Sequence, residues 1–263
     1  MSKKAKSFEE FYSKNKDDIL DIDIVADYAE SHDGDTTPFD KDMFCPECNQ
    51  AQLTLVAKTS NHRAYLKRIP SSLHTKWCSF NYEYATKKII QEYVNLLSDS
   101  ELKDKLDAIM RLLCKPELVH SYLTSSDVCN NSTRVSPMLI PSKVDSFSSL
   151  KALRRKKLGT YIDQSENGIL YAFYGKAQLK IYCCERKNTD SNKKYKIHFL
   201  NVFAPNSKKE WKQRASFYLG TNPLSIDESA LYHIVFIGYP KFENKYPKIE
   251  LIKNRAFVYQ KIE

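Results

Sequence analysis

Glycine is scarce in this 263-residue chain, and long apolar runs are absent. The six glycines form neither a GxGxxG loop nor a Walker loop nor a GxSxG elbow, which argues against dinucleotide-binding, P-loop and α/β-hydrolase chemistry. No apolar run approaches the roughly 20 residues that cross a bilayer. The N-terminus lacks the apolar region of a secretory signal. We therefore expect a cytoplasmic protein.

A disulfide framework is also missing from the pattern of cysteines. There are seven, an odd number, with no secretory leader, so we expect reduced thiols. Cys183 and Cys184 are adjacent on an expected strand, where successive side chains point to opposite faces, so they are poorly placed to bind one ion together.

The clearest chemical signal is a pair of short motifs, Cys45-Pro-Glu-Cys48 and His74-Thr-Lys-Trp-Cys78. Thiolates and an imidazole suit the tetrahedral preference of zinc, and both internal spacings direct two ligands to one point. With four protein ligands no coordination position is open for water, so the expected cofactor is a structural zinc ion. Two alternatives stay open: the cysteines pack as small apolar residues beside a surface His74, or His62 replaces His74.

This segment resembles the N-terminal zinc segment of CoiA-like competence proteins. In that family a Cys-Pro-x-Cys knuckle precedes a β-hairpin and a His-containing element that leads to helices. The match covers residues 44–80, through the Cys45–Cys48 knuckle and the His74–Cys78 pair. CoiA-like proteins carry a nuclease-type domain, but the match covers only this short segment. The resemblance therefore implies a zinc-binding fold, and the nuclease activity is not carried over to this chain.

The remaining patterns predict two domains and an α+β fold class. The expected first domain, 1–122, is helical with an embedded zinc ribbon or treble-clef-like hairpin, and 123–142 reads as a linker rich in Ser, Thr and Asn. The expected second domain, 143–263, is small, basic and β-rich. Its order of elements is that of an OB-type barrel, but other small mixed sheets have the same order. The expected helices are 7–31, 82–97, 99–113 and 207–218, and the expected zinc hairpin pairs 52–57 with 62–67.

Charge is unevenly distributed between these halves. The chain carries a net charge of +9, and residues from 143 onward contain 23 Lys and Arg against 11 Asp and Glu. A basic half suggests a polyanionic partner. The alternative explanation for the excess of lysines is that they serve only as soluble surface residues. The mildly acidic first domain is expected to offer a surface to a protein partner.

Basic residues interleave with aromatic residues in the second half, which is typical of proteins that bind phosphates and stack on bases. We therefore expect a zinc-stabilised accessory factor that binds DNA or RNA, with single strands as one option, and we expect some of the aromatic residues to be core. The candidate contacts are Arg154, Arg155, Lys156, Lys157, Lys180, Arg186, Lys194 and Lys196.

Two other functions remain open on the sequence. A magnesium-dependent nuclease of the PD-(D/E)xK type would use Asp163, Glu185 and Lys187, with the carboxylates on the metal and the lysine orienting water. A protein-interaction module would present the same basic surface to an acidic partner. The nuclease is the only enzyme that the sequence suggests, and we expect a binding protein instead.

Overall fold

The computed structural model describes residues 6–60, 62–114, 135–144, 147–187, 194–206, 208–243 and 247–262. The chain divides into two compact units. The first unit combines Met1–Glu83 with Pro116–Ser136, and the second combines Tyr84–Lys115 with Pro137–Glu263. Of the expected linker, 123–134 lies outside the described residues, and Leu139–Ser142 forms part of a strand. Nowhere in the described ranges is a helix both long and apolar enough to cross a membrane.

The first unit consists of short strands around one helix. Its two three-stranded sheets have the orders β1-β6-β5 and β3-β2-β4. The elements are β1 Ser7–Phe8, β2 Glu10–Ser13, β3 Asp18–Asp21, α1 Ile22–Ser31, the 3-10 turn η1 Thr37–Phe39, β4 Met43–Phe44, β5 Leu53–Val56, β6 Tyr65–Arg68 and the 3-10 turn η2 Ser79–Asn81.

The expected helix over 7–31 is wrong in its first half. Burial of β2 alternates, with Phe11 and Ser13 inside, which is the period of a strand. Asp17 then takes a left-handed backbone conformation (φ 50°) in the tight turn to β3, and the helix begins only at Ile22. The expected hairpin is confirmed, since β5 and β6 pair antiparallel.

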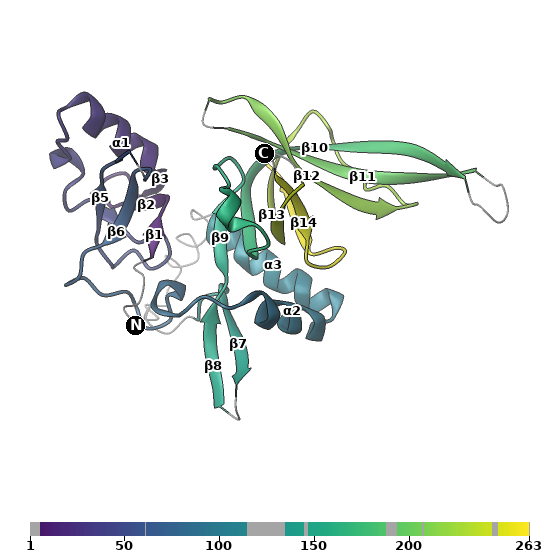
Figure 1. Ribbon diagram of the computed structural model, residues 1–263, viewed down its shortest axis with the longest axis horizontal. Helices are drawn as coiled ribbons and strands as arrows, with labels where there is room; N and C mark the ends of the chain where they lie inside the picture. The colour runs from purple at the N-terminus through teal and green to yellow at the C-terminus, as the bar shows by residue number, and fades with distance from the viewer. Residues whose placement is uncertain are drawn as a thin grey trace, which may run out of the picture. The chain divides into compact units, whose positions relative to one another are not determined.

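The second unit contains a seven-stranded sheet and two of the three described α-helices (Figure 1). The strand order is β15-β13-β14-β12-β11-β10-β9, and β13 also pairs with β10. The elements are α2 Lys87–Leu96, α3 Asp99–Cys114, β7 Leu139–Val144, β8 Phe147–Ala152, β9 Arg154–Lys157, the 3-10 turn η3 Gln164–Glu166, β10 Tyr171–Lys187, β11 Lys194–Pro205, β12 Trp211–Gly220, β13 Leu231–Phe242, β14 Pro247–Leu251 and β15 Phe257–Lys261.

Five of these strands close into a ring because β10 is long enough to pair twice. Its first half, Tyr171–Gln178, pairs with β13, and its second half, Gln178–Lys187, pairs with β11. From β11 the ring continues through β12 and β14 back to β13. The contact between β12 and β14 is parallel, and the other contacts in the ring are antiparallel.

The first half of β10 is buried on both faces. Phe173 packs inside the ring with Phe217 and Phe236, whereas Tyr174 faces the opposite way, toward the cluster that contains α3 residue Leu106. Helix α3 packs on β10, β13 and β15 (Figure 1). The ring interior and the helix-covered face are therefore two separate cores that share strands.

The expected fold class is wrong in assigning a helical N-terminal domain. The described chain is mostly β, and α2 and α3 belong to the second unit, where they cover a sheet. The expected helix 207–218 is instead β12. Ala215 and Phe217 are buried while Ser216 and Tyr218 are exposed, and this period of two is that of a strand. Ser207, the first residue of the expected helix, lies outside the described residues.

Two glycines permit close approach of backbones in the second unit. A Cβ atom at Gly238 would overlap the carbonyl oxygen of Glu250 on the paired strand, and one at Gly159 would lie 2.5 Å from the carbonyl oxygen of Pro205. Only glycine fits these contacts without a backbone shift.

The alternation along β12 predicts unequal effects of substituting neighbouring rings. Phe217→Ala removes a side chain that is 2% exposed, and it should lower the free energy of unfolding by about 3–5 kcal/mol. Tyr218→Ala, at a position 51% exposed, should cost less than about 1 kcal/mol. Urea unfolding of both variants measures this, and equal losses would contradict the assignment of β12.

Candidate functional site

The two ligand pairs predicted from the sequence converge in the first unit. The Cys45, Cys48, His74 and Cys78 ligand atoms all lie within 4.8 Å of one another, so the group could hold a metal ion. The Cys45 and Cys78 sulfurs are 3.8 Å apart. His74 Nδ1 lies 3.4 Å from the Cys48 sulfur and 3.5 Å from the Cys78 sulfur.

The first pair sits on a tight backbone turn after β4. The Cys45 N–H donates to the Ala51 carbonyl at 2.8 Å, and the Asn49 N–H donates back to the Cys45 carbonyl at 2.9 Å. Asn49 adopts φ 51°, a conformation that asparagine tolerates better than most residues. This turn places both sulfurs on one side of the knuckle.

The second pair is held by rings and by the knuckle itself. His74 stacks near Phe8 and Phe80, with ring centroids 6.0 and 5.7 Å away. The Glu47 carboxylate, within the knuckle, accepts hydrogen bonds from the Ser79 N–H at 2.5 Å and the Ser79 hydroxyl at 2.6 Å. Ser79 follows Cys78 directly, so this contact ties the two ligand pairs together.

The electrostatic environment of the three thiols favours the binding of a cation. Burial raises the pKa of the Cys45 thiol, whereas hydrogen bonds with the Cys45 and Cys78 sulfurs lower the pKa of Cys48. Crowded, buried sulfurs cannot all ionise unless a positive charge neutralises them, and a bound metal ion would stabilise all three thiolates. The helix expected over 82–97 begins later than predicted, because Cys78 leads into the short turn η2 and α2 begins only at Lys87.

The basic residues at β9 are engaged within the protein. The Lys156 side chain is only 9% exposed, and its ammonium lies 2.9 Å from Glu166 Oε1 and 3.0 Å from Oε2. The Arg154 guanidinium lies over the Tyr84 ring at 4.1 Å. Arg155 and Lys157 are half-buried and also have interactions. This cluster is therefore a poor phosphate-binding surface.

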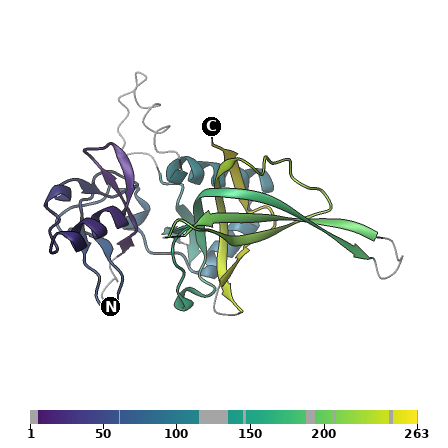
Figure 2. The same ribbon diagram turned by 90° about the horizontal axis from the view of Figure 1, so that it is seen from above.

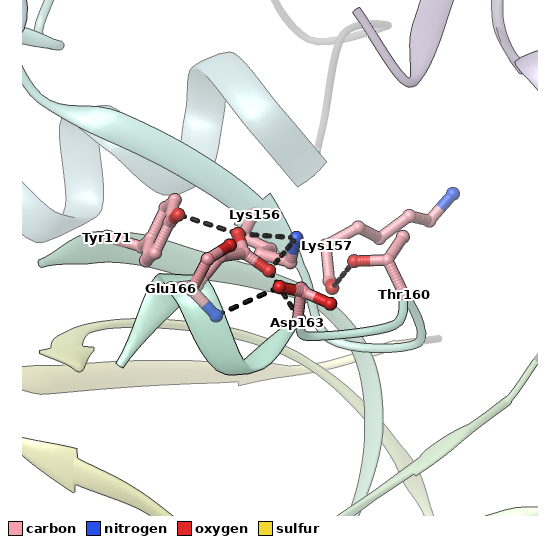
Figure 3. A network of polar contacts seen from close by, with 7 residues as sticks. Lys156, Lys157, Thr160, Asp163, Glu166 and Tyr171 are labelled. Atoms are coloured by element: carbon pink, nitrogen blue, oxygen red, sulfur yellow. Dashed lines mark hydrogen bonds and ion pairs between the residues drawn. The ribbon is translucent and has the colours of Figure 1, made fainter. Parts of the chain in front are cut away.

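Figure 3 shows the network around Lys156. The Tyr171 hydroxyl donates to Glu166 Oε1 at 2.6 Å, and the Asp163 N–H donates to Glu166 Oε2 at 2.8 Å. Asp163 Oδ1 in turn accepts the Ser165 N–H at 2.9 Å, and hydrogen bonds with the Ser165 side chain and backbone lower the Asp163 pKa. These contacts form a capping box that fixes η3 against β9 and β10, which is a structural role.

The structure does not bring the nuclease candidates together. Asp163 caps η3, beside the start of β10, whereas Glu185 and Lys187 lie near the far end of the same strand. Glu185 is 14 positions beyond Tyr171 on β10, and at roughly 3.3 Å per residue an extended strand covers about 45 Å over that distance. One magnesium ion cannot contact both carboxylates.

The other basic candidates are exposed on the hairpin of β10 and β11. They are Lys180, Arg186, Lys194 and Lys196. Lys180 and Arg186 share a face of β10 with Tyr182, because residues two apart on a strand point the same way.

A row of rings crosses this face over three neighbouring strands. Tyr182 on β10 pairs with Phe199 on β11, and Phe199 pairs with Tyr218 on β12. The ring centroids are 6.4 Å apart in the first contact and 5.6 Å in the second. Tyr182 is 56% exposed and Tyr218 is 51% exposed. We call these three residues the aromatic row.

A shallow groove is lined by Tyr182 and Phe199 of the row. Its polar lining includes Asn201, whose Oδ1 accepts hydrogen bonds from the Ser216 hydroxyl at 2.7 Å and from the Gln213 amide at 3.3 Å. Sequence reasoning missed the β12 side of the groove because it placed those residues on a helix. The alternation of Ala215 and Phe217 with Ser216 and Tyr218 was the signal that could have found it.

The buried ion pair at β9 yields a stability prediction. Glu166→Gln leaves the Lys156 charge without its counter-ion, and it should cost about 3–5 kcal/mol of unfolding free energy. The double variant Lys156→Met/Glu166→Gln should recover most of this loss.

The matched control is Glu243→Gln, which alters an exposed ion pair with Lys241 and Lys248 and should change stability by less than about 1 kcal/mol. Chemical denaturation compares the three variants. A double variant as unstable as Glu166→Gln would contradict the assignment of the ion pair.

Comparison with known proteins places the chain in no family. No family model matches it, and neither a curated protein nor a solved structure matches it significantly. These comparisons do not support the resemblance to CoiA-like proteins. The structure does show the group of metal ligands on which that resemblance was based.

Proposed function

We propose that this protein is a nucleic-acid-binding accessory factor that holds a single strand on the exposed face of β10, β11 and β12. The observation that carries the proposal is the aromatic row of Tyr182, Phe199 and Tyr218, flanked by exposed cations on the same hairpin.

The aromatic row is suited to bases that are not paired in a duplex. Exposed rings offer stacking platforms for every base, because each base has a π-face, and each stacked base contributes about 1–3 kcal/mol. The rings stand one per strand, so successive bases of an extended chain have successive partners. A duplex hides its base faces and cannot use the row in this way.

Cations beside the row supply contacts to phosphate. Lys180 and Arg186 lie on either side of Tyr182 along β10, and both are exposed. Ionic contacts to the backbone with stacking on rings hold single strands with little sequence preference.

The order of strand closure adds support from architecture. The ring β10-β11-β12-β14-β13 resembles an OB barrel, a five-stranded Greek-key barrel whose second and third strands present the binding face. Here the second and third strands of the ring are β11 and β12, which carry two of the three rings. DNA and RNA are both compatible with this surface.

The metal in the first unit is proposed to be zinc with a structural role. A zinc–sulfur bond of about 2.3 Å puts tetrahedral sulfur ligands about 3.8 Å apart, and a sulfur and a nitrogen about 3.6 Å apart. The Cys45–Cys78 distance of 3.8 Å and the His74–sulfur distances of 3.4 and 3.5 Å match these values. Three thiolates and an imidazole fill the coordination sphere, so the ion would fix the fold of the unit.

Zinc binding predicts a loss of metal and of stability on ligand substitution. Cys48→Ser should abolish stoichiometric zinc and destabilise the first unit, because the binding free energy of a structural ion is folding free energy. Metal analysis and thermal unfolding measure both effects. The control Cys183→Ser, at an exposed cysteine, should keep its zinc. Full zinc content in Cys48→Ser would refute the ligand set.

The aromatic row predicts ring-dependent binding of oligonucleotides. Tyr182→Ala and Tyr218→Ala should each weaken binding of labelled oligothymidylate or oligouridylate by about 5- to 100-fold while leaving the fold intact. Fluorescence anisotropy at two salt concentrations measures this.

Tyr161→Ala, at a ring 58% exposed away from the row, is the matched control and should bind like the original chain. Equal affinity of all three variants, or binding of the original chain that is insensitive to salt, would reject the proposal.

A further inference from the structure

The hairpin of β10 and β11 continues beyond the strand that flanks it. The last pair between β11 and β12 joins His198 to Gly220, where β12 ends. Past the pair Cys183–His198, residues 184–187 and 194–197 pair only with each other among the described residues. We call this two-stranded extension the ribbon. Figures 1 and 2 show β10 and β11 projecting beyond the other strands.

The ribbon is strongly cationic and exposed. Its charged residues are Glu185, Arg186, Lys187, Lys194 and Lys196, and all five are exposed. The Lys194 ammonium lies 3.4 Å from the Glu185 carboxylate, which leaves three positive charges in excess.

One pair in the ribbon opposes like charges. Lys187 and Lys194 are direct cross-strand partners in the antiparallel register. Like charges directly opposite each other destabilise a strand pair. The Glu185 carboxylate beside Lys194 offsets part of this cost, and an anion bound between the two lysines would remove more of it. A neutral pair, or a pair of opposite charges, at these two positions would make the hairpin more stable.

The ribbon is also continuous with the aromatic row. Tyr182, Cys184 and Arg186 follow one another on one face of β10, and Phe199, Ile197 and Tyr195 oppose them on β11. A strand that leaves the row along the hairpin reaches Arg186 on the same face. Lys187, Lys194 and Lys196 lie on the opposite face of the ribbon, so the ribbon presents cations on both faces.

We propose that the ribbon binds the duplex that adjoins the single strand, so that the protein recognises a junction between double-stranded and single-stranded nucleic acid. This inference rests on the proposed function of the aromatic row. The major groove of B-DNA is about 12 Å wide and admits a two-stranded ribbon, whereas the row accepts only unstacked bases. The two surfaces therefore fit the two sides of a junction, and DNA is the duplex whose major groove suits the ribbon.

The test compares three labelled DNA ligands with the full-length, zinc-loaded protein. They are a thymidylate strand of about 12 nucleotides, the same strand as a tail on one helical turn of duplex, and that duplex with blunt ends. Joining two contacts in one ligand should make the tailed duplex bind at least about tenfold more tightly than either part.

Substitution of the ribbon separates its role from that of the row. Lys187→Gln/Lys194→Gln removes two cations without breaking the core, and it should lower the salt dependence for the tailed duplex by about two counterions. The tenfold advantage should fall to about threefold or less. Affinity for the single strand should change little, because Lys187 and Lys194 lie on the face opposite to the row, whereas Lys180 and Arg186 on the row face are kept. Lys103→Gln/Arg111→Gln, at exposed positions on α3, is the matched control and should keep the advantage.

The outcomes distinguish failure of this inference from failure of the proposed function. Absence of single-strand binding by the original chain would overturn both. Single-strand binding without an advantage for the tailed duplex, or an advantage that survives in the ribbon variant, would overturn the junction alone. Polyglutamate is also compared with unlabelled DNA of equal charge as a competitor of the tailed duplex. If polyglutamate displaces the duplex equally well, the result indicates an acidic protein partner and overturns the junction.

Discussion

Double pairing of β10 is the constraint on which the second unit depends. This strand meets β13 with its first half and β11 with its second, so the ring closes only if both registers hold together. Because Phe173 and Tyr174 are buried on opposite faces, any slip by one residue would exchange the ring interior with the helix-covered face. The rigid first half thereby orients the exposed second half, where Tyr182 and Arg186 stand.

Local patterns made part of this structure predictable. Each ligand pair has a short internal spacing, so the local backbone directs both of its side chains toward one position. The grouping of the ligands could therefore be predicted from the sequence. The antiparallel zinc hairpin was confirmed, and α3 begins at Asp99, as expected of the helix over 99–113. Ser98 and Glu101 form a capping box at its start. In each case the information lies within a few neighbouring residues.

Non-local partners explain most of what the sequence did not predict. Phe8, Phe11 and Tyr12 have helical spacing, but the sheets of the first unit pair these residues as strands. Lys156 reads as a surface cation, and only Glu166 and Tyr171, brought together by folding, make it a buried one. The aromatic row shares this difficulty, because its rings come from three strands and become neighbours only through the register of the sheet.

The close contacts at Gly159 and Gly238 have a consequence for how this chain can diverge. The rings of the row face solvent, so Tyr, Phe and Trp can replace one another there while the surface keeps its character. Any Cβ at Gly159 or Gly238 meets a backbone carbonyl that a rotamer change cannot move. Among diverged homologues, these two glycines are therefore better markers of common ancestry than the exposed residues that carry the chemistry.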